Sequence, residues 1–175
     1  MSDAFESDRL RFRPQRIEDA EALHEAYADE ELMRYWSSAP HATVADTAAY
    51  LTPDPQGKPW RGWSIMLKDA DRAIGTLAAT ETKPGVSEIG FLLARRWWGR
   101  GYAREAVARL LDLLFREEGM RRVWADADPD NAPSNRLLEA LGFRREGLLR
   151  GEWETHIGVR DSVIWGLLRD EWRGP

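Results

Sequence analysis

Hydrophobic residues recur at helical spacing near the N-terminus and at strand spacing from the second third of the chain onward. Ala20, Leu23 and Tyr27 fall on one stripe, which indicates an amphipathic helix. Later runs are short and bounded by turn residues, as in strands. The pattern predicts helices over residues 17–28, 30–36, 44–51, 101–118 and 134–141, strands over residues 8–12, 62–67, 73–80, 86–94, 122–127, 143–149 and 162–168, and a loose end over residues 2–7.

More of these strands are joined by turns than by helices. This arrangement favours an α+β domain of three layers with a mixed sheet. No internal repeat, low-complexity tract or linker divides the chain. With 175 residues, the chain can bury roughly 70% of the surface that it exposes when unfolded, so its core needs no disulfide or metal.

Composition and charge exclude several classes of protein. The chain has no Cys, which rules out disulfides, thiolate zinc sites and a cysteine nucleophile. Its 25 Lys and Arg against 30 Asp and Glu argue against broad, non-specific binding to nucleic acid. His24 has no second histidine at the spacing of a zinc-protease helix, so no metal is expected. No apolar run could span a membrane and no signal pattern opens the chain, so a cytoplasmic protein is expected.

The segment over residues 88–105 carries the strongest chemical signal: a strand, a loop with two glycines, and a helix. Gly99 and Gly101 fall where the helix begins, and glycine there permits a turn that aims several N–H groups at one point. The first helical turn and its dipole then favour an anion. Three arginines add positive charge: Arg96, Arg100 and Arg104. The segment therefore predicts a phosphate or pyrophosphate cradle.

Two other phosphate-binding loops do not fit these residues. A P-loop needs Gly-Lys-Ser/Thr, whereas Gly99 is followed by Arg100 and Gly101. A dinucleotide-binding loop needs a third glycine where the chain has Arg104, and it usually follows a domain's first strand. Two glycines can also serve only a turn and a helix start, and that interpretation stays open on these residues alone.

Three segments together resemble the Gcn5-related N-acetyltransferase (GNAT) superfamily. RWWGRG over residues 96–101 fits its Arg/Gln-x-x-Gly-x-Gly/Ala signature, and NAPSNRLLEALGF over residues 131–143 is similar to the Asn-x-x-Ser-x-x-Leu…Gly-Phe motif of its RimJ/RimL-like branch. The opening DRLRFRP over residues 8–14, followed by EDA at residues 18–20, resembles the start of that branch. The three occur in the order and spacing of the family.

The resemblance implies one acetyltransferase domain over residues 8–172, with a mixed, mostly antiparallel sheet of six to seven strands that is splayed in its centre. Acetyl-CoA would lie in the splay as co-substrate, with its pyrophosphate on the glycine turn and its pantetheine along the strand that precedes the turn. The residues that the resemblance assigns to acetyl-CoA are Leu92, Leu93, Ala94, Arg96, Trp98, Gly99, Arg100, Gly101, Tyr102, Ala103, Arg104, Asn131 and Asn135.

Acetyl transfer to an amine requires a neutral nitrogen. A terminal α-amino group is about 14% neutral at pH 7, whereas a lysine is only about 0.04% neutral, so the demand for a general base depends on the acceptor. Glu88, which opens the strand before the cradle, is the candidate base, and some members of the family place a glutamate similarly. The alternative is a solvated residue at the strand end that pairs with an arginine.

The leaving thiolate needs a proton or a hydrogen bond. Many family members carry a tyrosine as general acid at the position that is Leu138 here, so that acid is missing. Ser134 is the predicted substitute, and its alternative role is the N-cap of the helix over residues 134–141. Asn131 could likewise be only a turn residue.

The sequence does not specify the acceptor. Large aromatic residues in or beside predicted loops are candidates for its pocket, although each could instead belong to a small cluster under a loop. The candidates for binding the acceptor are Trp36, Trp63, Trp153 and His156. We expect direct attack in a ternary complex on a protein α-amino group or a small amine, with a homodimer left open. The alternative is a non-catalytic acyl-CoA-binding sensor or interaction module.

Overall fold

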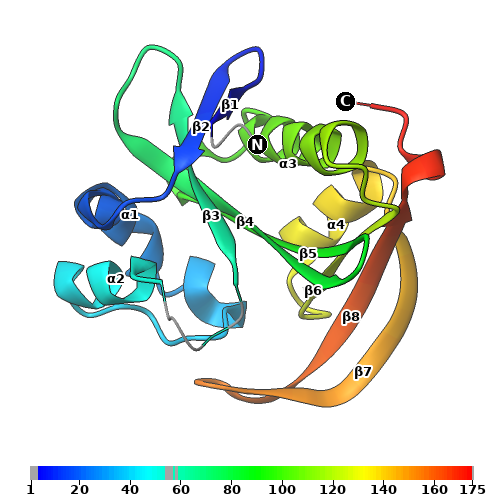
Figure 1. The fold of residues 1–175 in the computed structure, drawn as a ribbon. Helices are drawn as coiled ribbons and strands as arrows, with labels where there is room; N and C mark the ends of the chain where they lie inside the picture. Colours follow the sequence, from blue (N-terminus) through cyan, green and yellow to red (C-terminus); the bar gives the residue numbers. More distant parts are fainter. Residues whose placement is uncertain (1–3, 54–56, 58, 175) are drawn as a thin grey trace.

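The computed structural model describes residues 4–53, 57 and 59–174. Within these residues one mixed sheet contains eight strands in the order β1-β2-β3-β4-β5-β6-β8-β7 (Figure 1). The strands are β1 (Phe5–Glu6), β2 (Leu10–Pro14), β3 (Arg61–Leu67), β4 (Ala73–Lys83), β5 (Val86–Leu93), β6 (Arg122–Ala127), β7 (Arg144–Thr155) and β8 (Gly158–Leu168). All neighbours are antiparallel except β5 and β6.

Helices cover both faces of this sheet. They are α1 (Ala20–Tyr27), α2 (Val44–Leu51), α3 (Tyr102–Asp112) and α4 (Ala132–Ala140), with short 3-10 segments η1 (Ile17–Asp19), η2 (Leu32–Tyr35), η3 (Arg95–Trp97) and η5 (Arg169–Glu171), and a π-helical extension of α3, η4 (Leu113–Glu117). Figure 1 shows α1 and α2 on one side of the sheet and α3 and α4 on the other.

Two buried clusters hold these layers together. The larger cluster packs α3 and α4 against one face of the sheet and contains Leu110, Val123 and Leu138. The smaller cluster packs α1, η2 and α2 against the other face, where Leu23 and Leu92 are nearly inaccessible to solvent. Apolar side chains that alternate along the strands therefore feed both layers, which confirms the predicted three-layer α+β architecture.

The sheet opens at its one parallel junction. Strands β5 and β6 pair only at Val86 with Arg122, Ser87 with Val123 and Glu88 with Trp124. Beyond Glu88, β5 continues to Leu93 beside β4 alone, while β6 continues beside β8. The two strands therefore stop pairing after Glu88, and this opening is the predicted splay.

The structure corrects several of the predicted elements. Residues 5–6, expected in a loose end, form β1 against β2. The segment expected as a helix over residues 30–36 is only a 3-10 turn, and α4 begins at Ala132 rather than at Ser134. Residues 150–161 were expected to be a loop, but they extend β7 and β8 into a long hairpin. Most of this hairpin is exposed on both faces, so it lacks the hydrophobic alternation that marks a strand.

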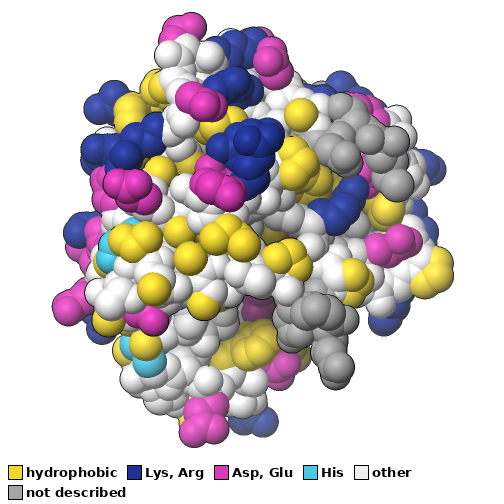
Figure 2. Space-filling model, turned by 60° about the vertical axis from the view of Figure 1, so that its left-hand side comes forward, with side chains coloured by type: hydrophobic (Ala, Val, Ile, Leu, Met, Phe, Trp, Pro, Cys, Tyr) yellow, Lys and Arg dark blue, Asp and Glu magenta, His cyan; other side chains and the backbone are white. Residues whose placement is uncertain are grey.

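Figure 2 shows a side of the molecule on which Lys and Arg side chains are interspersed with Asp and Glu, with a band of hydrophobic side chains across the middle. None of the helices in the described part of the chain is long and apolar enough to cross a bilayer.

Candidate active site

The edge of β5 that faces the opening presents main-chain groups from alternate residues. The N–H of Ala94 donates to the carbonyl of Ile74 at 3.0 Å, so Ala94 faces β4. In an antiparallel ladder alternate residues face opposite neighbours, so Leu92 also faces β4 and Leu93 faces the opening. The carbonyl of Leu93 accepts a hydrogen bond from Trp98 Nε1 at 2.7 Å. Of Leu92, Leu93 and Ala94, which were all expected to contact the pantetheine through the main chain, Leu93 is the one whose main-chain N–H and carbonyl face the opening.

A tight turn joins β5 to α3 at the mouth of this opening. Gly99 and Gly101 have φ values of 73° and 79°, in the left-handed region that favours glycine. Gly101 is the N-cap of α3, and no side chain caps the helix there. The first-turn amides of Tyr102, Ala103 and Arg104 therefore remain available to an anion outside the helix.

The N-terminal strand holds this turn in place. Arg9 Nη1 donates to the carbonyl of Arg100 at 3.0 Å, and Arg9 Nε donates to Glu105 Oε2 at 2.7 Å. The guanidinium also lies 4.6 Å from the centre of the Tyr102 ring. Burial raises the pKa of Glu105, but hydrogen bonds from Arg9 and Ser7 outweigh burial and lower that pKa. Sequence reasoning missed Arg9 because nothing local links it to a turn some 90 residues later.

The three arginines of the predicted cradle differ in their surroundings. Arg96 pairs with Glu25 of α1 at 3.0 Å. The guanidinium of Arg100 lies over the Trp97 ring at 5.2 Å, and Arg104 is exposed. Arg100 and Arg104 can therefore offer charge to an anion at the turn, whereas Arg96 also ties the turn to α1.

Glu88 lies where β5 and β6 separate, at their last paired position. Its side chain is on the face opposite α3 and α4, because Ile89 belongs to the α3 cluster and successive strand residues alternate. Glu88 is only 8% exposed, so the alternative of a solvated strand-end residue is wrong. Glu88 is therefore a buried carboxylate beside the opening.

A second carboxylate, which sequence reasoning missed, lies on the same face. Asp126 Oδ2 accepts hydrogen bonds from Trp153 Nε1 at 2.8 Å and Ser162 Oγ at 3.0 Å. Residues 122–127 alternate between half-buried and buried positions, and Asp126 is a half-buried one. The small apolar residues at every second position of this strand could have predicted the position of Asp126, because they place Asp126 on the same face of the strand as Trp124.

The N-terminal turn of α4 borders the opening from the β6 side. Asn131 is the N-cap, and its side chain accepts from the Ser134 N–H at 3.3 Å. Ser134 is therefore not the cap, which corrects that alternative, and within the described residues its half-buried hydroxyl makes no hydrogen bond to protein. Asn135 donates to the carbonyls of Asp128 and Asn131 and accepts from Trp165 Nε1, so its amide is used to hold the loop before α4.

Comparison with known protein families shows which family the chain belongs to. The acetyltransferase (GNAT) domain profile matches residues 9–144. The chain belongs to the GNAT acetyltransferase family. The uncharacterized N-acetyltransferase p20 of Bacillus licheniformis is 33% identical over 174 residues, which are 96% of this chain and 97% of that protein. The protein is accordingly an N-acetyltransferase, and the family transfers an acetyl group from acetyl-CoA to an amine.

Solved structures of GNAT proteins superimpose on nearly all of the chain. The GNAT-family acetyltransferase from Bacillus anthracis gives a TM-score of 0.85 at 26% identity and covers 96% of this chain and 99% of its own. The spermidine N-acetyltransferase from Vibrio cholerae, solved with CoA and spermine, gives 0.78 at 20% identity and covers 93% of this chain and 97% of its own. At that identity the second match shows the fold alone.

The family's tyrosine position is occupied here by an interior side chain. Leu138 is fully buried in the cluster under α3 and α4, so its side chain has no access to the opening. Within the described ranges, no group of His, Asp and Glu side chains forms a set that could hold a metal ion.

The structure separates the four residues expected to bind the acceptor. Trp153 is 46% exposed on β7 and reaches Asp126. His156 lies at the tip of the β7–β8 hairpin and, with Ile157, lines a cavity of about 520 Å³ whose other walls are Glu30, Glu31, Arg34 and Pro40. Trp36 is half-buried and donates from Nε1 to the Tyr50 hydroxyl at 3.1 Å.

Trp63 does not belong with the acceptor candidates. It lies in β3, is 4% exposed and packs edge-on against Phe5 with ring centres 5.6 Å apart. Its cluster is the one under α3, on the face of the sheet away from Glu88. The expectation that Trp63 lines an acceptor pocket is therefore corrected: Trp63 lies beside a predicted loop, but it is part of β3 and its side chain is buried.

Proposed function

We propose that the protein transfers the acetyl group of acetyl-CoA to a primary amine by direct attack in a ternary complex. The acceptor is a protein N-terminal α-amino group or a small-molecule amine. The observation that carries the proposal is the glycine turn at Gly99 and Gly101, which opens onto the gap between β5 and β6. A buried carboxylate, Glu88, stands at the point where that gap begins.

The residues at the turn suit a pyrophosphate. A side-chain carbon at Gly99 would meet no described protein atom within 4 Å, so the space beside the turn is open to a ligand. The amides of residues 99–104 and the exposed Arg104 supply hydrogen bonds and charge. The main-chain N–H of Leu93 faces the opening, where it would bind the acyl-pantetheine arm and the acetyl carbonyl.

Glu88 takes a proton from the acceptor, directly or through one water molecule, so that the nitrogen lone pair attacks the thioester carbon. The C–N bond forms, the C–S bond breaks, and the thiolate leaves. The Ser134 hydroxyl, which Asn131 positions through the Ser134 N–H, donates a hydrogen bond to the sulfur or orders the water that protonates it. Asn131 and Asn135 thus act by shaping the turn of α4.

The acceptor approaches from the face of the sheet that carries α1 and α2. Glu88 and Asp126 lie on that face, and Trp153 and the tip of the hairpin close it at one side. Two carboxylates and an exposed indole suit a cationic amine, because both attract positive charge. An α-amino group and a polyamine both meet this description, and the branch resemblance favours the α-amino group.

Thermal unfolding with and without acetyl-CoA, followed by a thiol-release assay, tests the proposal. The ligand at 100 times its dissociation constant should stabilise the protein by about 2.7 kcal/mol. A panel of N-terminal peptides, polyamines and amino sugars should then release free thiol with at least one member. Stabilisation without thiol release from any amine would refute amine acetylation and would favour the sensor alternative.

A further inference from the structure

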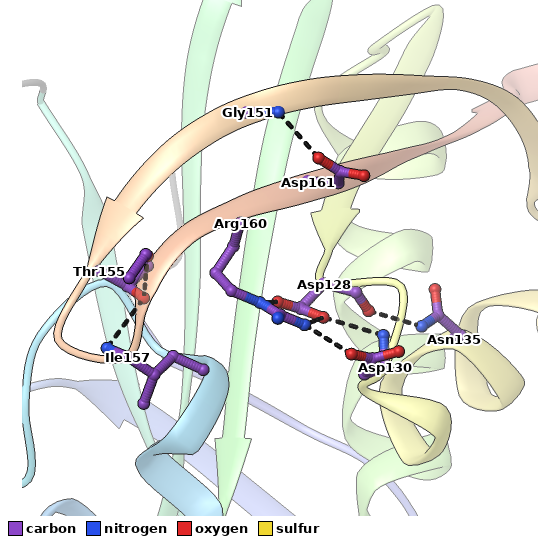
Figure 3. A network of polar contacts seen from close by, with 9 residues as sticks. Asp128, Asp130, Asn135, Gly151, Thr155, Ile157, Arg160 and Asp161 are labelled. Carbon is purple, nitrogen blue, oxygen red and sulfur yellow. Dashed lines mark hydrogen bonds and ion pairs between the residues drawn. The ribbon is translucent and has the colours of Figure 1, made fainter.

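Arg160 of β8 makes ion pairs with two aspartates on the β6 side of the opening. Its Nε donates to Asp128 Oδ2 at 2.7 Å, and its Nη2 donates to Asp128 Oδ1 at 2.9 Å and to Asp130 Oδ2 at 2.6 Å. Figure 3 shows the guanidinium between the hairpin and the loop that precedes α4. One side chain therefore binds both carboxylates of this loop.

The loop that Arg160 holds leads directly into the turn that carries Ser134. Asp128 also accepts from the Asp130 N–H at 2.8 Å, and the Asp128 carbonyl accepts from the Asn135 amide at 2.9 Å. Asn131, which follows Asp130 in the chain, is the N-cap of α4, and its side chain accepts a hydrogen bond from the Ser134 N–H. Hydrogen bonds therefore connect Asp128 and Asp130 to the first turn of α4.

The Arg160 guanidinium also lies near Tyr35, on the face of the sheet from which the acceptor is proposed to approach. Its carbon lies 5.8 Å from the centre of the Tyr35 ring in η2. Trp153, directly opposite Arg160 in the β7–β8 ladder, reaches Asp126. The hairpin is braced at the Gly151 N–H, which donates to Asp161 Oδ1 at 2.8 Å (Figure 3).

We propose that Arg160 is a positioning residue for acetyl transfer: by fixing Asp128 and Asp130 it sets the first turn of α4, and with it Ser134, relative to the β5–β6 opening. The inference rests on the proposed function. Arg160 acts through the loop and touches neither the thioester nor the amine.

Burial makes this clamp sensitive to the shape of the cation. The Asp128 side chain is 6% exposed and that of Arg160 is 27% exposed. Removing the cation leaves a buried carboxylate without its partner, so the loop must rearrange to reach water. Lysine restores a charge but cannot form the planar fork that reaches both oxygens of Asp128 and also Asp130.

The chain offers a matched control on the same strands. Arg122 of β6 makes a two-pronged pair with Glu146 of β7 at 2.7 and 2.6 Å, and its side chain is 23% exposed. Arg122 lies at the opposite end of β6 from the loop before α4. Loss of that pair therefore removes a similar interaction without touching the turn that carries Ser134.

The experiment compares Arg160→Met, Arg160→Lys and Arg122→Met in the full chain. For an amine that the wild type acetylates, Arg160→Met should lower kcat between about 10- and 100-fold, because a displacement of about 1 Å at a reacting group has that effect. Affinity for CoA should change less than about 2-fold, and Arg160→Lys should recover part of kcat. Arg122→Met should lower the melting temperature comparably and leave kcat within about 2-fold.

Hydrogen exchange gives a readout that needs no turnover. Arg160→Met should speed exchange by about 10-fold or more at the amides of residues 128–135, apart from Pro129 and Pro133, which have no N–H, and should leave residues 98–104 unchanged. Equal kcat in Arg160→Met and Arg122→Met, or unchanged exchange at residues 128–135, would overturn the proposal. Failure of the wild type to release thiol with any amine overturns the proposed function instead, and the exchange data then still decide whether Arg160 sets this turn.

Discussion

On the β5 side of the opening the candidate site comes from one stretch of chain, residues 93–105, with Arg9 as a brace. On the β6 side three distant segments meet: η2, the loop before α4, and the hairpin. The first side relies on main-chain conformation and presents N–H groups. The second relies on charged side chains that fix one another.

The difference matches the two ligands of the proposed reaction. A carrier with a constant pyrophosphate can be bound by main-chain groups, which a mutation elsewhere leaves in place. An acceptor that differs between family members must be bound by side chains, which evolution can replace one at a time. We therefore expect mutations on the β5 side to affect affinity for CoA, and mutations on the β6 side to affect turnover and amine selection.

Glu88→Gln should have the largest effect, because Glu88 stands between the two sides. Removal of a general base lowers kcat by about 100-fold or more, and the isosteric amide leaves the fold intact. Affinity for CoA, measured by calorimetry, should stay within about 2-fold of the wild type. The control is Glu154→Gln on the exposed hairpin, which should leave kcat unchanged. A kcat for Glu88→Gln within 3-fold of the control would exclude Glu88 from the proton transfer.

Gly99→Ala tests the main-chain side by affinity. Gly99 and Gly119 have φ values of 73° and 71°, and a side-chain carbon at either would meet no described protein atom within 4 Å. Both substitutions therefore carry a similar conformational cost, on the order of 1–2 kcal/mol. Only Gly99→Ala places a methyl group where the pyrophosphate is proposed to lie, so only it should weaken CoA binding, by about 30-fold or more.

The Gly119→Ala variant makes that experiment decisive. Two variants with equal losses in melting temperature and equal affinity for CoA would show that the turn at Gly99 is only structural. A loss of affinity confined to Gly99→Ala would instead assign the turn to the ligand.

The same contrast explains what the sequence could predict. The glycine turn could be read from Gly99 and Gly101, because a left-handed φ requires a particular residue type at a particular position. The positions of the strands from β2 to β6 along the chain could be predicted from hydrophobic runs and turn residues. Local signals of this kind identify an element whatever the rest of the chain does.

The other side could not be read in this way, because its decisive contacts link residues that are distant in sequence. Arg160 is one of many arginines, and nothing near it indicates Asp128 as its partner. Residues 150–161, the outer part of the hairpin that carries Arg160, include no buried residue and so show no hydrophobic alternation. The prediction for Trp63 was wrong for the opposite reason: a nearby predicted loop suggested an exposed aromatic side chain, but Trp63 is buried in β3.

Ser134→Ala should have a smaller effect and refines the β6 side. The Asn131 cap accepts from the Ser134 main chain, which alanine keeps, so the melting temperature should change by less than about 1 °C. Loss of one hydrogen bond to the departing sulfur should lower kcat by about 10-fold. Asn131→Ala is the contrasting variant: loss of a cap costs about 1 kcal/mol, or about 2–4 °C. A Ser134→Ala variant that melts lower with unchanged kcat would contradict the proposed role of the hydroxyl.

The smallest expected effect is on the acid dependence of the melting temperature. It compares the Arg160–Asp128 ion pair with the Arg9–Glu105 ion pair. Burial raises the pKa of Asp128, but hydrogen bonds from Arg160 outweigh burial and lower it below the ordinary value of 3.8; Glu105 is lowered below 4.5 in the same way by Arg9 and Ser7. A carboxylate whose pKa is lower in the folded state stabilises the fold above its ordinary pKa, and that stabilisation is lost as the pH falls through the folded pKa.

Melting temperature measured from pH 6 to pH 2.5 should therefore decline less steeply below about pH 4.5 in Asp128→Asn and Glu105→Gln than in the wild type, by a few degrees each. The control Asp170→Asn removes a carboxylate that is 96% exposed and should keep the wild-type slope. Because Asp128 holds the turn of α4 and Glu105 holds the glycine turn, Asp128→Asn should lower kcat already at neutral pH and Glu105→Gln should weaken CoA binding already at neutral pH, each with a flatter acid profile than the wild type. The reverse assignment would show that the two braces do not serve separate sides.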